Sequence, residues 1–291
     1  MKIILAMLIF GTVGVLRRSV AFPSGFTAML RGFIGAAVIL VSMLIMRKKP
    51  SLRAIRKNLP LLILSGAFIG VNWILLFEAY SYTSVALATT CYYMAPIFVV
   101  IVSPFALGER IGLVKAGCVI LALAGVTLVS EPWTDGFFGG SSFIGIILAI
   151  GAAAFYAGVT VLNRKMKDIP SMDMTLVQLL VGAAVVLPYT IIAEDIEPSM
   201  FDPLSVLLVF VLGAVHTGFA YILYLGSVNK LPAATSSIFG YIDPIFAVLL
   251  SAFALGEELS LLAVVGAVVI LAATVISELF GNKSIFKMKR R

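Results

Sequence analysis

The sequence predicts an all-α integral membrane protein with ten transmembrane helices, arranged as two inverted five-helix repeats. Three observations predict this fold class: an apolar composition, ten apolar runs of spanning length, and a repeat that relates the two halves. Of the 291 residues, 61% are hydrophobic and 12% are charged, whereas a soluble domain is roughly half apolar and about a quarter charged. One core cannot bury such an excess of apolar side chains, so most must face lipid or other helices.

Ten apolar runs reach the length of about 20 residues that a spanning helix needs. They are 3–21, 24–46, 59–80, 84–104, 111–130, 142–162, 173–193, 204–226, 232–254 and 260–280. The connections are short and carry Pro and Gly, so we expect no extramembranous domain. The first run resembles a signal peptide, but Arg17 and Arg18 interrupt the region where cleavage would occur, and we expect a retained helix.

The basic residues follow the pattern of a membrane protein. If the N-terminus is cytoplasmic, every Lys and Arg except Arg17, Arg18 and Arg31 falls on the cytoplasmic side, and the opposite connections are acidic. We therefore predict a multi-pass protein of the cytoplasmic (cell) membrane with both termini in the cytoplasm. The net charge of +7 lies on no soluble module, so no nucleic-acid partner is expected.

An internal repeat relates two segments of the chain. Residues 93–109 read YMAPIFVVIVSPFALGE and residues 241–257 read YIDPIFAVLLSAFALGE, identical at most positions. Each half holds an odd number of spans, so the second half must be inverted in the membrane. We divide the chain into an N-terminal repeat, 1–135, and a C-terminal repeat with a basic tail, 136–291. Inverted repeats favour alternating access, because each half can adopt the conformation of the other.

The paired Pro-Ile-Phe and Ala-Leu-Gly-Glu motifs, in a five-plus-five arrangement, resemble the EamA-type transporters of the drug/metabolite transporter superfamily. The resemblance covers essentially the whole chain. It implies a ten-helix inverted-repeat fold around a central cavity. It also implies transport of amino acids, other metabolites or organic cations, and it does not fix which.

Asp243 is the sharpest candidate for a functional residue. It lies near the middle of the ninth run, directly before Pro244, and its repeat partner is the neutral Ala95. A carboxylate at the bilayer centre costs about 2.5–3.5 kcal/mol, so we expect it to face the interior and to bind a proton or a cationic substrate. A structural carboxylate satisfied by a neighbouring side chain is the alternative. Pro96 and Pro244 are equivalent in the repeat and predict a hinge or cavity-lining carbonyls, with a static kink as the alternative.

Other polar and aromatic residues of the same helices are candidates for substrate contact. His216, the only histidine, either relays protons with Asp243 or donates to a helix carbonyl as a neutral ring. Arg31 could bind a substrate carboxylate, but for both Arg31 and Glu78 a structural ion pair is the expectation. The remaining pocket candidates are Asn72, Trp73, Tyr92, Tyr93, Tyr241 and Ser237. An aromatic box around a carboxylate suits an ammonium group, and ordinary helix packing is the alternative.

Further features bound the function. Gly66 and Gly70 are spaced for close helix approach, which we interpret as packing between the halves. Cys91 and Cys118 lie in apolar runs and support neither a disulfide nor a metal site. The sequence holds no nucleotide motif or metal-ligand cluster, so no cofactor is expected and energy must come from a gradient or from exchange. The expected partners are the lipid bilayer, a small-molecule substrate and, as a candidate coupling ion, the proton; the oligomeric state stays open.

These observations predict a secondary active transporter that exports small polar metabolites, amino acids or related amines, by alternating access. A proton-coupled importer of a quaternary amine such as choline is the alternative within this class. A membrane-embedded enzyme would need paired acid and base groups, and the spans offer only Asp243 and His216. A passive channel would need a continuous polar stripe on several helices, which the apolar runs lack.

Overall fold

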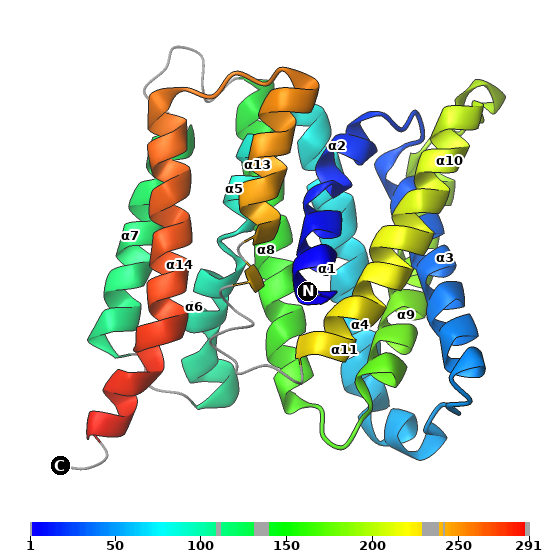
Figure 1. Ribbon diagram of the computed structural model, residues 1–291, viewed down its shortest axis with the longest axis horizontal. Coiled ribbons are helices and arrows are strands. Elements are labelled where there is room, and N and C mark those ends of the chain that lie inside the picture. Colours follow the sequence, from blue (N-terminus) through cyan, green and yellow to red (C-terminus); the bar gives the residue numbers. More distant parts are fainter. Residues whose placement is uncertain (1, 109–111, 131–139, 229–238, 241, 289–291) are drawn as a thin grey trace.

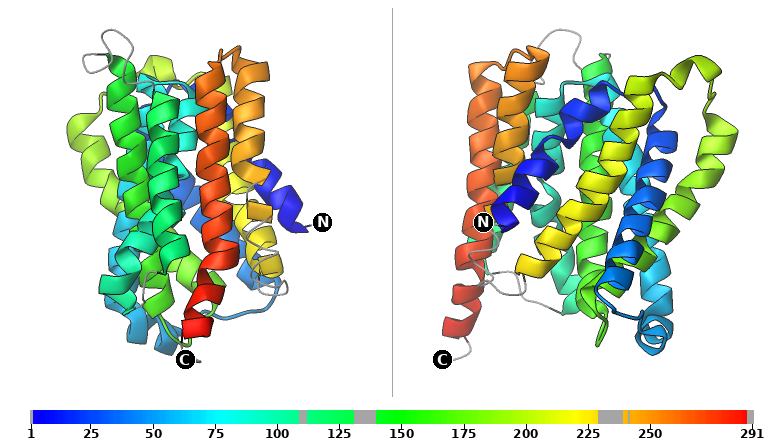
Figure 2. Two further views of the ribbon diagram at one scale, coloured as in Figure 1. Left: turned by 90° about the vertical axis from the view of Figure 1, so that its left-hand side faces the viewer. Right: turned by 45° about the vertical axis from the view of Figure 1, so that its right-hand side comes forward.

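The computed structural model is an all-helical bundle over the residues it describes, which are 2–108, 112–130, 140–228, 239, 240 and 242–288. For 129, 130, 228, 278 and 280–288 only the backbone is described. The helices run between an upper and a lower end of the molecule (Figure 1), and two further views show the same two ends (Figure 2). Among the described residues no strand occurs. The all-α prediction is therefore confirmed for this part of the chain.

Helical segments fall within each of the ten predicted runs. Those up to residue 130 are α1 (Lys2–Gly11), α2 (Val13–Arg18), α3 (Ser24–Ile45), α4 (Leu52–Tyr82), α5 (Val85–Tyr92), α6 (Ala95–Leu107) and α7 (Leu113–Ser130). Those that follow are α8 (Ser141–Lys165), α9 (Ser171–Ala193), the 3-10 turn η2 (Pro198–Met200), α10 (Pro203–Val211), the π-helical segment η3 (Leu212–Phe219), α11 (Ala220–Val228), α13 (Ile242–Leu255) and α14 (Leu261–Met288).

Six helical segments of the described chain are long and apolar enough to cross a membrane. They are Ser24–Ile45, Leu52–Tyr82, Val85–Leu107, Ser141–Lys165, Ser171–Ala193 and Pro203–Ser227. Shorter apolar helices cover Leu113–Leu128, Ile242–Leu255 and Leu261–Ser277. These lengths and compositions are those of a membrane protein. The count of ten spans and the inverted relation of the halves stay predictions.

Two helix boundaries differ from the predicted ones. Helix α4 begins at Leu52 rather than near residue 59, so Arg53, Arg56 and Lys57 lie in its first turns and not in a loop. Helix α14 continues past residue 280 to Met288. Hydropathy detects only the apolar part of a helix, and polar turns that extend beyond the lipid carry no such signal.

Within the described residues, two of the predicted helices are interrupted. The first breaks at Thr12 between α1 and α2, and the fourth breaks after Tyr92 into α5 and α6. Figure 1 shows α5 in the upper half of the molecule and α6 in the lower half, so the second break lies near mid-height. Pro96 is the second residue of α6, where its missing N–H breaks no intrahelical hydrogen bond. Pro96 therefore follows an interruption and is not a kink inside one continuous helix.

The packing of the helices brings distant parts of the chain together. Helix α4 packs against α8 and α9, α3 against α9 and η3, α5 against α8 and α13, and α7 against α14. A Cβ atom added at Gly70 would lie 2.7 Å from the carbonyl oxygen of Gly182, and one at Gly66 would lie 3.0 Å from that of Gln178. The predicted close approach at Gly66 and Gly70 is therefore confirmed, and the partner is α9.

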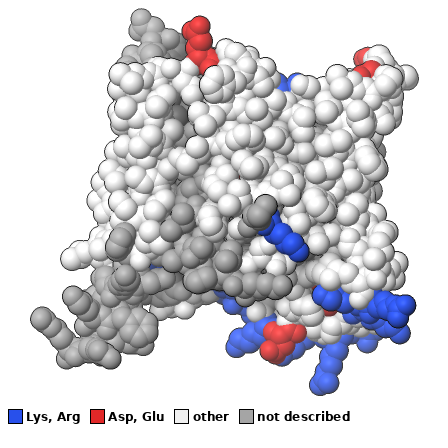
Figure 3. Space-filling view, in the orientation of Figure 1, with Lys and Arg blue, Asp and Glu red and all other residues white. Residues whose placement is uncertain are grey.

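Charged side chains concentrate at the two ends of the bundle. In Figure 3, Lys and Arg gather at the lower end, where α4 begins, while the wall between the ends is mostly uncharged. Lys57 and Asp168 form an ion pair of 2.8 Å, and the hydrogen bond and charge of Lys57 lower the pKa of Asp168. This distribution places the uncharged wall where lipid would lie.

Candidate functional site

A carboxylate and a tyrosine hydroxyl meet beside the break in the fourth predicted helix. Tyr93 lies between α5 and α6, and Asp243 is the second residue of α13. The Tyr93 hydroxyl donates a hydrogen bond of 2.5 Å to Oδ2 of Asp243. Both side chains are half-buried and keep surface that a small ligand can reach. The contact joins the two copies of the repeated segment, because Tyr93 is the first residue of 93–109 and Asp243 lies directly before Pro244 in 241–257.

Tyrosine rings line the surroundings of this hydrogen bond. The Tyr92 ring meets the Tyr93 ring edge-on at 6.0 Å and the Tyr156 ring at 5.8 Å. Tyr156, on α8, is 42% exposed. A carboxylate with aromatic neighbours provides both the charge and the π-faces that an ammonium group prefers.

Arg31 is the second charge at membrane depth, and its side chain is 7% exposed. Its guanidinium lies over the Trp73 ring at 4.6 Å and near the Phe77 ring at 5.2 Å. The structural ion pair expected for Arg31 and for Glu78 is wrong, since the ion pairs among the described residues are Arg18–Glu257 and Lys57–Asp168. Aromatic faces and a threonine hydroxyl replace the expected carboxylate beside Arg31.

His216 lies in η3 and contacts the break between α1 and α2. Its Nε2 is 2.7 Å from Oγ1 of Thr12, and its Nδ1 is 3.2 Å from the Val211 carbonyl oxygen. A ring protonated on Nδ1 donates to the Val211 carbonyl, and its Nε2 then competes with the Ile9 carbonyl oxygen, 2.8 Å from Thr12 Oγ1, for the single hydroxyl hydrogen. No described hydrogen bond joins His216 to Asp243. The geometry therefore fits the carbonyl-bonded role and not a direct relay.

The other predicted pocket residues have different neighbours. Asn72 is buried, and its Nδ2 donates to the Ala152 carbonyl oxygen at 2.7 Å, which ties α4 to α8. Trp73 is buried and stacks on Arg31. Pro244 is buried at the start of α13. Tyr241 and Ser237 lie outside the described residues.

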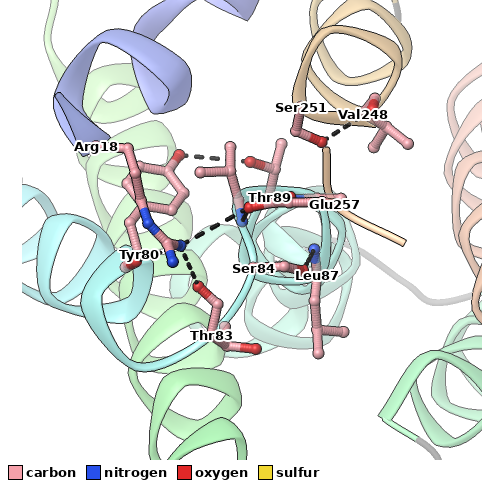
Figure 4. Close-up of polar contacts among 11 residues, drawn as sticks. Arg18, Tyr80, Thr83, Ser84, Leu87, Thr89, Val248, Ser251 and Glu257 are labelled. Carbon is pink, nitrogen blue, oxygen red and sulfur yellow. Dashed lines mark hydrogen bonds and ion pairs between the residues drawn. The ribbon is translucent and has the colours of Figure 1, made fainter. Parts of the chain in front are cut away.

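A polar network at the upper end was not predicted (Figure 4). We call it the upper lock; it consists of Arg18, Glu257 and the backbone groups they bind. The Glu257 carboxylate accepts hydrogen bonds from the backbone N–H groups of Val85, at 2.8 Å, and Ala86, at 3.1 Å. These are the first N–H groups of α5, which have no partner within the helix, and the helix dipole favours a negative charge there.

Arg18 completes the upper lock from α2. Its Nη1 donates to the carbonyl oxygens of Tyr80, at 2.9 Å, and Thr83, at 3.0 Å, at the end of α4. The same nitrogen lies 3.7 Å from Oε1 of Glu257. The lock thus joins α2, α4, α5 and the connection after α13. The repeated Ala-Leu-Gly-Glu motif, which ends at Glu257, was the sequence signal that could have indicated it.

A cavity of about 310 Å³ lies beside the lock. Its lining includes Arg17, Arg18, Phe77, Glu78 and Tyr80. The Phe77 ring also lies 5.2 Å from the Arg31 guanidinium. This ring therefore separates the cavity at the upper end from the buried charge on α3.

Comparison with known families decides the functional class. Residues 1–131 and 143–279 match the model of the EamA-like transporter family. The chain belongs to the EamA-like transporter family. It is accordingly a multi-pass membrane transporter and not an enzyme, which confirms the sequence-based prediction of the class.

Relatives of this transporter are themselves described in general terms. The uncharacterized transporter YxxF of Bacillus subtilis strain 168 is 26% identical over 279 residues, which cover 93% of this chain and 86% of the YxxF chain. An uncharacterized transporter of Archaeoglobus fulgidus is 29% identical over 276 residues, covering 94% of each chain. A crystal structure of another protein matches with a TM-score of 0.67 at 20% identity, over 96% of this chain and 95% of that one. That likeness shows the fold alone.

Proposed function

We propose that this transporter exports small polar metabolites, with amino acids or related amines as the substrate class, by alternating access. The observation that carries the proposal is the hydrogen bond between Tyr93 and Asp243 beside the α5–α6 break. Secondary transporters commonly place substrate sites at interrupted helices near the bilayer midplane. A half-buried carboxylate among tyrosine rings is suited to an ammonium group or a proton at such a place.

The proposed orientation puts the lower end of the molecule in the cytoplasm, with both termini on that side. It is supported by the Lys and Arg side chains that gather where α4 begins (Figure 3), since cytoplasmic connections carry an excess of these residues. The upper lock then closes the outer end in this conformation. Transport in this scheme alternates between opening of the outer and of the inner end around the Tyr93–Asp243 site.

A quaternary amine such as choline, carried inward with protons, is the second candidate. The tyrosine rings around Asp243 favour it, because a quaternary ammonium group has no N–H to donate and depends on π-faces and charge. The two candidates differ in whether the substrate carries a primary amine, and a single uptake assay compares them.

The test is solute counterflow by purified transporter in proteoliposomes that hold a pH-sensitive dye. Amino acids and quaternary amines are supplied to wild type and to Asp243→Asn. Asp195→Asn is the matched control, since it removes the same charge from an exposed residue between α9 and α10. We expect saturable counterflow in wild type and in D195N, and in D243N a loss of either the proton movement or the transport of amines.

The outcomes separate the roles of Asp243. Loss of proton movement with surviving counterflow makes Asp243 the coupling carboxylate, and loss of amine counterflow alone makes it the ammonium partner. If D243N matches D195N in both readouts, the proposed site is wrong. If wild type carries neither amino acids nor quaternary amines, the substrate class is wrong.

A further inference from the structure

We propose that Arg31 is a carboxylate-binding subsite, so that the preferred substrate is a zwitterion whose carboxylate binds Arg31 and whose amino group lies toward Asp243. This inference rests on the proposed function. It adds recognition of the substrate carboxylate, which Asp243 alone cannot provide. It is carried by the way in which the Arg31 side chain is held and by what its terminal nitrogens do not contact.

The guanidinium of Arg31 is fixed on three sides by residues of α3's neighbours. Its Nε donates to Oγ1 of Thr217 at 3.0 Å. That hydroxyl in turn donates to the Leu212 carbonyl oxygen at 2.9 Å, a bond that the π-helical segment η3 makes available. The Trp73 and Phe77 rings cover the guanidinium. One donor is therefore used to orient the group, and the plane is set by the aromatic rings.

The two terminal nitrogens of Arg31 are left for a ligand. No hydrogen bond joins either of them to another described residue, and no described carboxylate is within ion-pair distance. In the described chain, two fully buried side-chain polar atoms lack a hydrogen-bond partner: Arg17 Nε and Thr190 Oγ1. The terminal nitrogens of Arg31 are not among them, so each keeps surface that a water-sized molecule can reach.

A buried guanidinium without a counter-charge is costly, and an anion of the ligand would supply what the protein omits. The planar fork of an arginine matches a carboxylate through two parallel hydrogen bonds. A doubly charged phosphate would call for a second cation, and the neighbouring Arg17 is committed elsewhere. Its Nη1 donates to the Val20 carbonyl at 3.2 Å and its Nη2 to Ser24 Oγ at 2.9 Å. One free arginine therefore favours a monoanion.

The position of Arg31 relative to Asp243 points to a zwitterion rather than a simple acid. The Phe77 ring, 5.2 Å from the Arg31 guanidinium, stacks on the Tyr80 ring at 6.4 Å. The Tyr80 hydroxyl lies 3.4 Å from Oγ1 of Thr89 on α5, the helix that ends one residue before Tyr93, the partner of Asp243. Arg31 and Asp243 form no ion pair with each other. Two opposite charges that are linked through these side chains but not paired with each other match the two ends of an α-amino acid.

The experiment uses Trp73, which lies against Arg31, as a fluorescent reporter in the full-length transporter. The sequence holds two tryptophans, and Trp133→Phe leaves Trp73 as the single emitter. The proteinogenic amino acids other than tryptophan are titrated beside their α-carboxamides, which keep the amine and remove the negative charge. We expect at least one acid to change Trp73 emission at a concentration where its amide does not. Arg31→Gln should weaken that acid about 10- to 100-fold and leave its amide within about twofold.

Two outcomes overturn the inference: equal binding of every acid and its amide to wild type, or undiminished discrimination in R31Q. If R31Q does not elute as a monodisperse protein, Arg31→Lys and Thr217→Val replace it. Both should give a smaller loss confined to the acids, since lysine lacks the fork and valine releases Nε. Counterflow of the amides by wild type distinguishes failure of this inference from failure of the proposed function. If the amides are transported and the acids are not preferred, the Arg31 subsite is wrong and the proposed function is still supported.

Discussion

At the scale of single residues, what a charged side chain within the bundle can bind depends on the neighbour that stabilises its charge. The Tyr93 hydroxyl stabilises the Asp243 carboxylate, and hydrogen bonds to charged groups contribute about 1.5–3 kcal/mol. An ammonium group or a proton that reaches Asp243 must compete with this hydroxyl. Tyr93 therefore sets how readily the site exchanges one partner for another, although it carries no charge itself.

Replacing Tyr93 by Phe tests this competition. Tyr93→Phe keeps the ring that meets Tyr92 at 6.0 Å and removes the hydroxyl that binds Asp243. We expect the amine concentration that gives half-maximal counterflow to fall about tenfold, because the ammonium group no longer competes with the hydroxyl for the carboxylate. Tyr82→Phe is the control, since it removes a hydroxyl from a ring that is 40% exposed at the end of α4. The same half-maximal concentration in Y93F and Y82F would show that the Tyr93 hydroxyl does not compete for Asp243.

The sequence indicated which residues carry charge within the membrane but not which residues they contact. Asp243, Arg31 and His216 were all recognisable, because polar groups in apolar runs are costly. Their partners come from helices that lie far apart in the chain: Tyr93 for Asp243, Thr217 for Arg31 and Thr12 for His216. Electrostatic reasoning predicted a carboxylate beside Arg31, and only the packing of α3 against α4 and η3 shows aromatic rings there.

At the scale of helices, close packing of α4 against α9 depends on glycine. A Cβ atom at Gly70 would lie 2.7 Å from the Gly182 carbonyl oxygen, closer than such contacts occur, and backbone atoms cannot rotate away. The helices would have to separate. Because α9 also packs against α3, which carries Arg31, such a separation would reach the proposed subsite.

Gly70→Ala should therefore destabilise the transporter by about 1–3 kcal/mol, the usual range for overpacking. Gly151→Ala is the matched control, since its added Cβ would meet Leu75 Cδ1 at 3.5 Å, an ordinary contact, and alanine favours a helix. Thermal unfolding of the detergent-solubilised protein measures both. A melting temperature of G70A equal to that of G151A would contradict the close approach.

Helix positions were largely predictable and helix interruptions were not. An apolar run has the same hydropathy whether its backbone is continuous or broken, so the breaks at Thr12 and after Tyr92 left no such signal. Pro96 indicated an irregularity, and its place at the second residue of α6 decides that the helix restarts there. Tyr93 contacts Asp243 from the interruption between α5 and α6. The part of this helix that was hardest to predict therefore positions a residue of the candidate site.

At the scale of the whole molecule, the upper lock has a counterpart in the sequence. The repeat pairs Glu257 with Glu109, and the offset between the starts of the halves pairs Arg18 with Lys165. Glu109 lies outside the described residues, and its role is predicted from this correspondence alone. If the halves are inverted, the second set belongs to the opposite end. One lock would then form as the other opens, which is what alternating access requires of a symmetric pair.

Opposite effects of two equivalent substitutions test this scheme. Glu257→Gln should open the outer end, because an amide gives neither the charge for Arg18 nor an equal acceptor for the first N–H groups of α5. Glu109→Gln should open the inner end instead. The measurement is labelling of Thr89→Cys from outside by an impermeant maleimide, with Cys91 and Cys118 replaced by Ser; Thr89 is 5% exposed and lies on α5 below the lock.

We expect labelling to become about tenfold faster in E257Q, the ratio for a loss of about 1.4 kcal/mol, and slower than wild type in E109Q. Glu258→Gln is the control, since it removes the adjacent charge from an exposed residue that makes no described bond to Arg18 or to the first N–H groups of α5. A change of the same sign in E257Q and E109Q would mean that these glutamates stabilise the fold generally. Substitutions on inverted elements should shift the equilibrium between two exchanging states in opposite directions. Opposite changes in the labelling rate of E257Q and E109Q, with E258Q at the wild-type rate, would therefore mean that each lock belongs to one of these states.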